Sequence, residues 1–404
     1  MNNNTIYKDS LLGKIPSDWE VKIMGEVATF INGKAYKQED LLSEGKYRVL
    51  RVGNFFTKGD WYYSDLEMED DKYVFNGDLM YAWSASFGPK YWNDEKTVYH
   101  YHIWKVVPSE LITKQFLYSL LLFDTEKIFS SKQGGTMFHI TKGDMEKRKL
   151  ALPNLLEQVR IAEVLSTWDK AISNVQTTIE QVELRNKWLM QELLTGKKRL
   201  KGFDGEWKEV RMKDVFDRVT RKNSENNTNV VTISAQRGFI LQTDYFNKNI
   251  ASEITDNYFL VEKGEFCYNK SYSNGYPWGA TKRLNDYDKA VVTTLYICFK
   301  IKNLNKNSGD FFEQFLEKNL LDKGLTKIAH EGGRAHGLLN VTPSDFFNLK
   351  ITIPAFEEQT SIAQVLQAAD KEVQVLKSKL DKLKEQKKGL MQVLLTGKKR
   401  LKTN

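Results

Sequence analysis

The sequence contains two copies of one segment, and this internal repeat constrains the fold more than any other feature. Residues 190–200 recur almost unchanged at 391–401. Between 152 and 201, 22 of 50 residues are identical to those found 201 positions further along, without a gap. Because such repeats mark duplicated structural units, the 404 residues are expected to form two halves with related folds.

Weaker matches extend the repeat into the more variable sequence that precedes each copy. The run Gly77-Asp78-x-x-Tyr81-x-x-Ser84-x-Ser86-x-Gly88 aligns with Gly264-Glu265-x-x-Tyr268-x-x-Ser271-x-Ser273-x-Gly275. The framework positions are kept and most others differ. We therefore predict four segments: a variable domain at 1–152, a constant segment at 153–201, a second variable domain at 202–353, and a second constant segment at 354–404.

Each constant segment is predicted to form one long helix. Its apolar residues recur at alternating intervals of four and three, which is the heptad pattern of a helix that packs along one seam. One polar residue interrupts the seam at the same heptad place in both copies, where it would fix the register at some loss of stability. Pro153 and Pro354 precede the helices, and Gly196 and Gly397 end them. The seam includes Ile161, Leu165, Ile172, Ile179, Asn186 and Leu193 in the first copy, and Ile362, Leu366, Leu380, Lys387 and Leu394 in the second.

A heptad helix cannot bury its seam alone, so the two helices are expected to pack on each other. An antiparallel coiled coil would place the two variable domains at opposite ends, related by a pseudo-two-fold axis. A helix of about 40 residues would span about 60 Å. The alternative is a coiled coil that binds a different protein.

The variable segments are predicted to be α+β domains with twisted β-sheets. Short runs of β-forming residues are separated by turn signals such as Asn32-Gly33 and Asn274-Gly275. One longer helix is expected in each domain. The predicted strands are Tyr47–Val52, Val98–Val107, Val230–Ser234 and Ala290–Ile301, and the predicted helices are Thr113–Ser130 and Gly309–Lys323.

Motifs for catalysis are absent from the sequence. There is no phosphate-binding Gly-x-x-x-x-Gly-Lys-Ser/Thr loop and no Gly-x-Gly-x-x-Gly dinucleotide loop. Cys267 and Cys298 are too few for a disulfide framework or a cysteine zinc site. His100 and His102 are interpreted as half-buried strand histidines and not as metal ligands. We predict a non-catalytic, metal-free chain. Because it has no apolar signal segment, we expect it to be soluble and cytoplasmic, without a membrane partner.

Together these residues resemble the specificity subunit of a type I restriction-modification enzyme. The resemblance covers essentially the whole chain. It rests on the pattern Pro-x-x-x-Glu-Gln-x-x-Ile-Ala-x-x-Leu-x-x-x-Asp at 153–169 and 354–370, and on the Leu-Leu-Thr-Gly-Lys tails that follow. The run from Gly77 to Gly88 is also similar to the first recognition domain of that family.

The resemblance implies that each variable domain recognises one half of a bipartite, asymmetric site in double-stranded DNA. The helices would act as a spacer and would dock two methyltransferase subunits, which use S-adenosylmethionine. Restriction subunits, which are motor-nucleases, would add ATP- and Mg²⁺-dependent translocation and cleavage. This chain itself would hold no cofactor. Two other hypotheses remain: a stand-alone enzyme that modifies or cleaves DNA, and a coiled-coil scaffold protein.

Candidate DNA-binding residues follow from the chemistry of base and phosphate contacts. Arg and Lys pair with guanine and Asn and Gln with adenine, whereas phosphates are bound by basic, hydroxyl and amide groups. The Lys-Lys-Arg runs at 197–199 and 398–400 are candidates for phosphate contacts, but we favour their interpretation as charges that complement the helix dipole. The candidates in the first domain are Lys34, Tyr36, Lys37, Arg51, Asn54, Trp83, Ser84, Ser86, Lys132, Gln133 and Thr136. Those in the second are Arg221, Lys222, Gln236, Arg237, Asn269, Lys270, Ser271, Tyr272, Arg334 and His336.

The net charge of +8 does not by itself identify a DNA-binding protein. Residues 1–152 carry 20 basic and 21 acidic side chains, and residues 202–353 carry 21 and 19. Most of the positive excess therefore lies in the two constant segments. Since phosphate contacts dominate affinity for DNA, the isolated chain is expected to bind DNA weakly.

Overall fold

The computed structural model describes residues 6–57, 59–84, 87–130, 139–246, 255–331 and 339–401. The chain divides into two compact units, one made of residues 1–178 and 377–404 and the other of residues 179–376. Each unit therefore combines one variable domain with part of both constant segments. The four predicted segments remain a division of the sequence, since the compact units cut across the constant ones.

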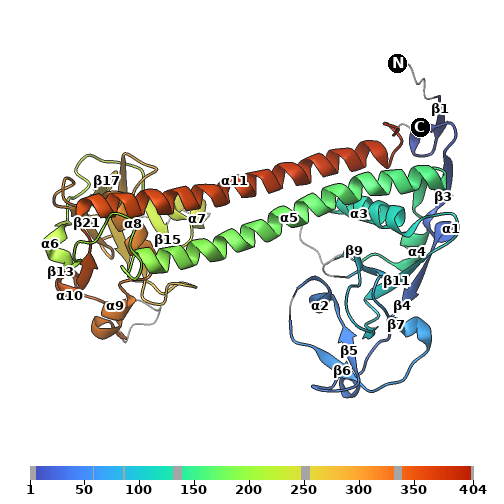
Figure 1. Cartoon of the computed structure of the whole chain (residues 1–404), viewed down its shortest axis with the longest axis horizontal. Helices are drawn as coiled ribbons and strands as arrows, with labels where there is room; N and C mark the ends of the chain where they lie inside the picture. Colours follow the sequence, from blue (N-terminus) through green and yellow to red (C-terminus); the bar gives the residue numbers. More distant parts are fainter. Residues whose placement is uncertain are drawn as a thin grey trace. The chain divides into compact units, whose positions relative to one another are not determined.

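Two helices of 39 residues each form the constant segments (Figure 1), as predicted: α5 (Leu155–Leu193) and α11 (Phe356–Leu394). Both end in the same way, because Gly196 and Gly397 each adopt a φ of 69°. Beyond these glycines the chain turns back: Lys198 N donates to Glu192 O at 3.2 Å, and Lys399 N donates to Val393 O at 3.0 Å. Glycine ends a helix in this manner because it enters the left-handed region without strain.

The two helices pair in antiparallel fashion within each unit. In the first unit, Ile161 and Leu165 from the start of α5 share a hydrophobic core with Leu394 from the end of α11. In the second unit, Leu193 from the end of α5 lies in a core with Ile362 from the start of α11. Nine of the eleven predicted seam residues are buried, whereas Ile172 and Leu380 are partly exposed.

The polar seam residues are buried and have polar partners. Asn186 is 5% exposed, and its Nδ2 donates to Ala369 O at 2.8 Å. Lys387 is 7% exposed, and its Nζ lies 2.6 Å from Asp169 Oδ1. Because each partner lies at one position on the facing helix, a shift in register would leave a buried polar group unsatisfied.

The described residues of the first unit form two four-stranded sheets and two strand pairs. The sheets have the strand orders β4-β11-β8-β9 and β6-β5-β10-β7, and the pairs are β1-β2 and β12-β3. The strands are β1 (Tyr7–Ser10), β2 (Gly13–Pro16), β3 (Glu20–Ile23), β4 (Ala28–Asn32), β5 (Tyr47–Leu50), β6 (Tyr62–Ser64), β7 (Tyr73–Val74), β8 (Leu79–Ala82), β9 (Gly88–Tyr91), β10 (Thr97–Tyr99), β11 (Ile103–Pro108) and β12 (Lys149–Leu152). The remaining helices are α1 (Met24–Val27), α2 (Val52–Phe56), α3 (Lys114–Ser130) and α4 (Lys142–Glu146).

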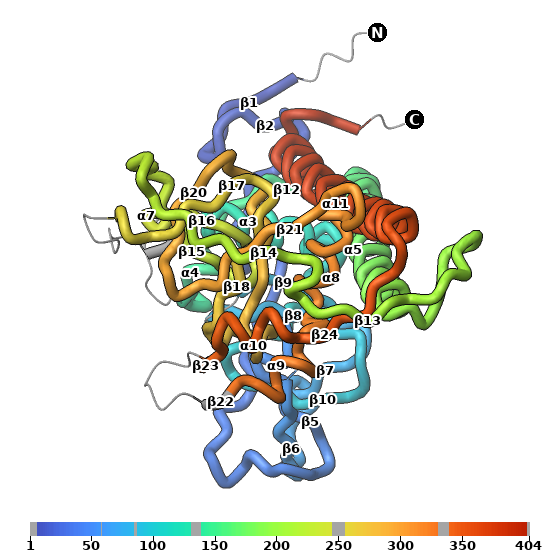
Figure 2. Tube along the Cα trace, turned by 90° about the vertical axis from the view of Figure 1, so that its left-hand side faces the viewer, coloured from blue at the N-terminus to red at the C-terminus, as the bar shows by residue number. Residues whose placement is uncertain are grey.

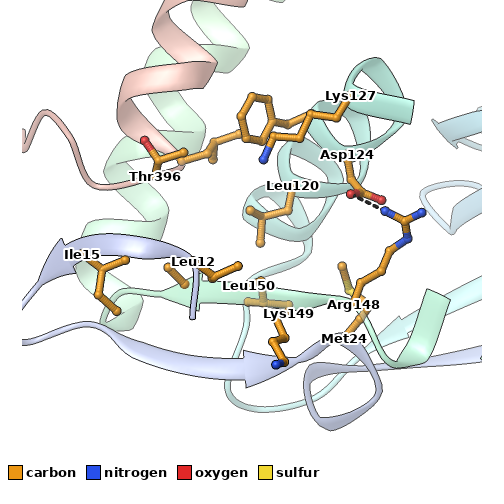
Figure 3. A pocket seen from close by; sticks show the side chains of 13 residues that line it. Leu12, Ile15, Met24, Leu120, Asp124, Lys127, Arg148, Lys149, Leu150 and Thr396 are labelled. Atoms are coloured by element: carbon orange, nitrogen blue, oxygen red, sulfur yellow. Dashed lines mark hydrogen bonds and ion pairs between the residues drawn. The ribbon is translucent and has the colours of Figure 1, made fainter. Parts of the chain in front are cut away.

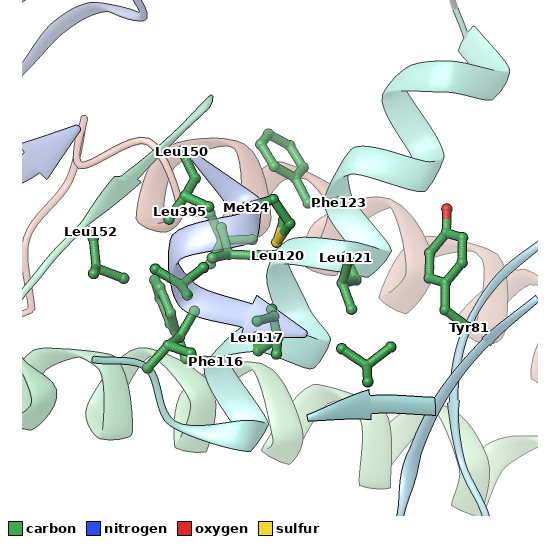
Figure 4. Close-up of a cluster of buried hydrophobic side chains, with 14 of the residues drawn as sticks. Met24, Tyr81, Phe116, Leu117, Leu120, Leu121, Phe123, Leu150, Leu152 and Leu395 are labelled. Atoms are coloured by element: carbon green, nitrogen blue, oxygen red, sulfur yellow. The ribbon is translucent and has the colours of Figure 1, made fainter. Parts of the chain in front are cut away.

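The largest core of the first unit forms where α3 meets the end of α11. Figure 4 shows Phe116, Leu117 and Leu120 of α3 gathered with Met24 and with Leu395, which follows α11. The hairpin β1–β2 lies beside the same end of α11 (Figure 2), and Tyr7 Oη donates to Gly397 O at 3.2 Å. The N-terminal and C-terminal parts of the described chain are therefore packed into one core.

The second unit repeats this framework. Its four-stranded sheet has the order β14-β21-β18-β19, which matches β4-β11-β8-β9, and the pair β13-β24 matches β3-β12. The strands are β13 (Lys208–Arg211), β14 (Phe216–Val219), β15 (Val231–Ser234), β16 (Gly238–Leu241), β17 (Phe259–Glu262), β18 (Phe266–Asn269), β19 (Ala280–Arg283), β20 (Lys289–Val292), β21 (Ile297–Ile301), β22 (His330–Glu331), β23 (Leu339–Asn340) and β24 (Lys350–Ile353). The helices are α6 (Met212–Val215), α7 (Gln242–Phe246), α8 (Gly309–Glu317), α9 (Asp322–Ile328) and α10 (Pro343–Asn348).

The repeated Glu-Gln dipeptide at the start of each long helix explains part of this similarity. Gln158 Oε1 accepts a hydrogen bond from Thr113 N at 2.8 Å, and its Nε2 donates to Pro153 O at 2.9 Å. Gln359 repeats both contacts, accepting from Ser308 N and donating to Pro354 O, each at 2.9 Å. In each unit one buried amide thus joins the long helix to the segment before the domain's own helix.

Three sequence predictions are wrong in detail. The predicted strand Val98–Val107 is two strands, β10 and β11, separated by a turn at 100–102, and Ala290–Ile301 is likewise broken into β20 and β21. The predicted helix Gly309–Lys323 ends at Glu317, where Asn319 adopts a positive φ of 59° before α9 begins. The turns that break these strands contain no Gly or Pro, so they lack the usual residues that mark a turn.

Cys267 and Cys298 face each other across β18 and β21 as free, buried thiols with their sulfurs 3.3 Å apart.

Within the residues that the structure describes, no helix is long and apolar enough to cross a membrane.

Candidate nucleic-acid interface

A turn of three residues, His100-Tyr101-His102, connects β10 to β11 at one end of the first domain. Its backbone is held by three separate segments: His100 N donates to Leu50 O at 2.9 Å, Tyr101 N donates to Lys34 O at 3.0 Å, and His102 O accepts from Trp83 N at 3.1 Å. Anchoring of this kind fixes the position of the side chains on the turn.

Gly33 allows the chain after β4 to approach this turn. A Cβ at position 33 would lie 2.2 Å from Tyr99 O and 2.6 Å from His100 O, both backbone atoms. No side chain can be accommodated there without moving the turn. The predicted Asn32-Gly33 turn signal therefore marks a close backbone approach.

A surface hollow of about 680 Å³ lies against the turn. We call it the β10–β11 hollow. It is lined by the turn itself and by three predicted DNA-binding residues, Tyr36, Arg51 and Asn54. Residues that are 64 positions apart in sequence are thus brought together. This is the main gathering of candidate residues in the first unit.

The side chains that line the hollow differ in how far their polar groups are already engaged with other residues. Arg51 makes no ion pair within the described residues, and its guanidinium lies 4.9 Å from the ring centre of Tyr62. Tyr36 stacks near His100 with ring centres 6.3 Å apart, and burial raises the pKa of its hydroxyl. Asn54 Nδ2 donates to Gly59 O at 3.2 Å and Asp60 O at 2.9 Å, which closes the loop beside the hollow.

The other candidates of the first domain surround this hollow or lie apart from it. Trp83 Nε1 donates to Tyr101 O at 2.8 Å, so its ring supports the turn. Lys34 contributes backbone bonds to the turn, whereas the exposed Lys37 pairs with Glu39 at 3.4 Å. Ser84 is only 5% exposed. Four further candidates, Ser86, Lys132, Gln133 and Thr136, lie outside the described residues.

In the second unit, two of the predicted DNA-binding residues are engaged in structural contacts. Arg221 Nη2 lies 2.7 Å from Glu265 Oε2, and Nη1 lies 3.4 Å from Glu262. Lys222 Nζ donates to Asn257 O at 2.7 Å. Both cations therefore hold the chain against β17, which leaves less of their charge for a phosphate.

The remaining described candidates of the second unit lie where β15 and β18 end and β16 begins. Gln236 Nε2 donates to Asn274 O at 3.2 Å, and Asn269 Oδ1 accepts from Ser271 N at 3.0 Å. Arg237 and Tyr272 are exposed, and Tyr272 is 66% exposed. Burial lowers the pKa of Lys270. Arg334 and His336 lie outside the described residues.

The sequence interpretation missed the side chains of the turn as site residues. His100 and His102 were assigned to a strand, but they lie between strands, where their rings line the β10–β11 hollow. The signal that could have identified them is the cluster of His, Tyr and His between two strongly apolar strands. Among the residues that the structure describes, no group of three His, Cys, Asp or Glu side chains could hold a metal ion.

A second, smaller hollow of about 120 Å³ lies in the first unit between the hairpin β1–β2, α3 and the segment after α11 (Figure 3). Its wall is mainly apolar, with Leu12, Leu120 and Leu150. Arg148 Nη1 lies 2.8 Å from Asp124 Oδ1 at its edge, and burial raises the pKa of Asp124 against the pull of this arginine. No predicted DNA-binding residue lines it.

A duplicated α+β unit that keeps its framework and varies the polar side chains on it is suited to the recognition of two different targets. A family profile described as "Type I restriction modification DNA specificity domain" matches residues 16–184 and again 204–385. The chain belongs to this family. It is accordingly a DNA-recognition subunit of a restriction-modification system, and not its catalytic component.

Individual relatives agree in length and architecture. The putative MjaX specificity subunit of Methanocaldococcus jannaschii is 26% identical over 449 residues, which cover 98% of this chain and 97% of the relative. The MjaVIII specificity subunit of the same organism is 22% identical over 96% of this chain and 95% of the relative. A crystal structure of the type I S subunit from M. genitalium has a TM-score of 0.53 at 16% identity, covering 98% of this chain and 97% of that chain. A structure described for complex assembly of the type I R-M system has a TM-score of 0.57 at 15% identity, covering 95% and 99%, so the fold is shared.

Proposed function

We propose that the chain recognises a bipartite, asymmetric DNA sequence, with the first half bound by the unit that contains residues 1–152 and the second by the unit that contains residues 202–353. The supporting observation is that the sheets β4-β11-β8-β9 and β14-β21-β18-β19 share one strand order. The side chains displayed on the two frameworks nevertheless differ. A non-palindromic site has two different halves, so it requires two domains that share a framework and differ in their surface side chains.

We further propose that the chain brings two methyltransferase subunits to this site, together with restriction subunits. S-adenosylmethionine, ATP and Mg²⁺ would be bound by those partners. This chain would contribute position and specificity, because the sequence contains none of the loops that cradle such cofactors. Action on DNA inside the cell places the complex in the cytoplasm.

The decisive experiment is co-expression with the cognate methyltransferase subunit, followed by mapping of methylated adenines in the host genome. We expect one split motif with two different halves. Exchange of residues 1–152 for the corresponding segment of another family member should change one half and leave the other intact. A continuous or palindromic motif would contradict the proposal.

An activity assay of the purified chain and the domain exchange separate the two other hypotheses. A stand-alone enzyme would modify or cleave DNA when the purified chain is supplied with S-adenosylmethionine or a divalent metal. A coiled-coil scaffold would leave the methylated sequence unchanged when the variable domain is exchanged. Neither hypothesis accounts for two diverged domains on one framework.

A further inference from the structure

The turn at 100–102 has a structural counterpart in the second unit. Tyr81 and Tyr268 occupy the same place in the repeat, and they pair with Trp104 of β11 and with Ile297 of β21. Counting back from these partners aligns His100-Tyr101-His102 with Thr293-Thr294-Leu295. The backbone agrees, because Ile103 N donates to His100 O at 3.0 Å and Tyr296 N donates to Thr293 O at 3.3 Å.

The two turns have the same backbone hydrogen bond but differ in every side chain. In the first unit the turn carries two imidazoles and a phenol. In the second it carries two hydroxyl groups and Leu295, which is 54% exposed. Leu295 is not part of the hydrophobic cores of the second unit. A methyl-bearing side chain there could contact the methyl group of a thymine.

The imidazole rings of His100 and His102 act as neutral hydrogen-bond donors and acceptors. Burial lowers the pKa of His100 to about 4, with His102 and Arg51 adding to the effect. Burial also lowers the pKa of His102, and His139 and Arg51 lower it further. At neutral pH each ring therefore has one N–H donor and one nitrogen acceptor. Such a pair suits the edge of a base better than a phosphate, which prefers a cation.

The rings are also held in place without using up their hydrogen-bonding groups. His102 packs edge-on against Trp83, with ring centres 5.1 Å apart, and lies 4.8 Å from His100. Within the described residues, the ring nitrogens of His102 make no hydrogen bond. Those of His100 have one long contact, in which Nδ1 accepts from His102 N at 3.5 Å. Two fixed, partly exposed rings thus retain free polar atoms beside Arg51.

We propose that the turn at 100–102 is a specificity-determining element that reads base edges in the first half of the DNA site, and that the turn at 293–295 does the same in the second half. This rests on the proposed function of the chain. His100 and His102 would supply neutral donors and acceptors, and Arg51 would bind guanine or a phosphate at the edge of the β10–β11 hollow. Thr294 and Leu295 would supply a hydroxyl group and a methyl contact in the second half.

The test uses the full-length chain co-expressed with its methyltransferase subunit, with methylated adenines mapped across the host genome. The variants are His102→Leu and His100→Thr, which place the residues of the second unit in the first, and Thr294→Ala. Glu110→Ala is the matched control, because Glu110 is exposed and follows the far end of the same strand, β11. Thermal melting of each purified complex reports whether a variant still folds.

We expect His102→Leu and His100→Thr to relax one or two positions in one half of the motif. Methylation at sites with a substituted base there should rise roughly tenfold or more relative to the cognate site. Thr294→Ala should relax the other half, and Glu110→Ala should leave both halves unchanged. If His102→Leu prevents assembly of the complex, His102→Asn keeps a polar planar group of smaller size and should relax the same position.

The result that overturns the inference is a set of folded complexes in which the histidine variants keep both halves of the wild-type motif. A change in the same half as Thr294→Ala would overturn it equally. Failure of the proposed function looks different: the unaltered chain would then direct methylation to no split motif at all.

Discussion

Arg400 forms a two-point ion pair with Glu157, a residue 243 positions earlier in the chain. Its Nε lies 2.5 Å from Oε1, and its Nη2 lies 2.7 Å from Oε2. The carboxylate is 1% exposed and also accepts from Trp19 Nε1 at 3.1 Å. One buried carboxylate in the first turn of α5 therefore binds both Arg400, near the end of the described chain, and Trp19, which immediately precedes β3.

The second unit contains the same arrangement, built from the other copy of each residue. Arg199 Nε and Nη2 lie 2.5 and 2.7 Å from the carboxylate of Glu358, which accepts from Trp207 Nε1 at 3.2 Å. The two arginines belong to the Lys-Lys-Arg runs. Their interpretation as partners of the helix dipole is wrong, since both are committed to a buried carboxylate.

Replacing Arg400 should destabilise the first unit strongly. Arg400→Met leaves the Glu157 carboxylate buried without its cation, which typically costs about 3–5 kcal/mol. Urea unfolding with amide hydrogen exchange, resolved by unit, would measure this loss in the first unit. The control Lys399→Met removes a neighbouring exposed cation and should change little. The double variant Arg400→Met with Glu157→Gln should recover part of the loss, and equal destabilisation by Lys399→Met would contradict the prediction.

The seam ion pair between Lys387 and Asp169 should respond unequally to removal of its two partners. Lys387 has 9% of its side chain exposed and Asp169 has 41%. Asp169→Ala leaves a buried ammonium unpaired and should cost about 1–3 kcal/mol. Lys387→Met leaves only a partly exposed carboxylate and fills the seam with an apolar chain, so it should be neutral or stabilising. Denaturant unfolding of both variants tests this order, and a larger loss for Lys387→Met would refute it.

The ion pairs Arg400–Glu157 and Lys387–Asp169 show which parts of the fold could be predicted from the sequence. The heptad positions identified the buried seam, and Asn186 and Lys387 were recognised as its polar members. Their partners were not predicted, because Ala369 O is a backbone atom and Asp169 lies beside the seam. Likewise, the repeat at 190–200 and 391–401 includes both arginines. It did not indicate that Arg400 meets Glu157, since the pairing depends on how each unit is assembled from both ends of its sequence.

The candidate DNA-binding residues were chosen by residue type, which does not show how each side chain is used in the fold. Residue type alone identified Arg51, Asn54 and Tyr36, which do line one hollow. The same criterion selected Arg221, which is committed to Glu265. It did not select His100 and His102, which were considered only as metal ligands and were assigned to a strand. A preference for basic and amide side chains finds groups that could bind DNA, but only the fold shows which of them are free.

The isolated chain should bind duplex DNA weakly at physiological salt. The two variable segments have nearly balanced charge, and cations such as Lys105 and Arg283 are paired with Asp78 and Asp310. Few phosphates can then be neutralised, so the slope of log K against log salt should be shallow. Fluorescence anisotropy with and without the methyltransferase subunit would show a steeper slope for the complex. Tight, specific binding by the chain alone at 150 mM salt, roughly the physiological range, would contradict this expectation.

Acid should weaken the first unit through His100. Its pKa falls from 6.5 to about 4 in the folded chain because of burial, so the folded state holds the proton less tightly than the unfolded state. The stability that the neutral ring allows is fully present above pH 6.5 and is lost as the pH falls towards 4. His100→Asn should remove this dependence, and the difference should reach about 1–2 kcal/mol because the ring is partly exposed. Parallel unfolding curves for the two proteins from pH 7.5 to about 4.5 would refute the prediction.

Gly33 provides the most direct test of how the turn is positioned. A Cβ at residue 33 would meet two backbone oxygens at 2.2 and 2.6 Å, and neither can move without displacing the turn at 100–102. Gly33→Ala should therefore cost about 1–3 kcal/mol, and in a folded complex it should reduce discrimination in the first half of the DNA motif alone. Gly143→Ala is the matched control, because a Cβ there has no heavy atom within 4 Å and the position lies in α4. Unfolding curves and methylation maps of both variants separate the outcomes: a loss of stability with an unchanged motif would show that displacement of the turn does not affect base recognition.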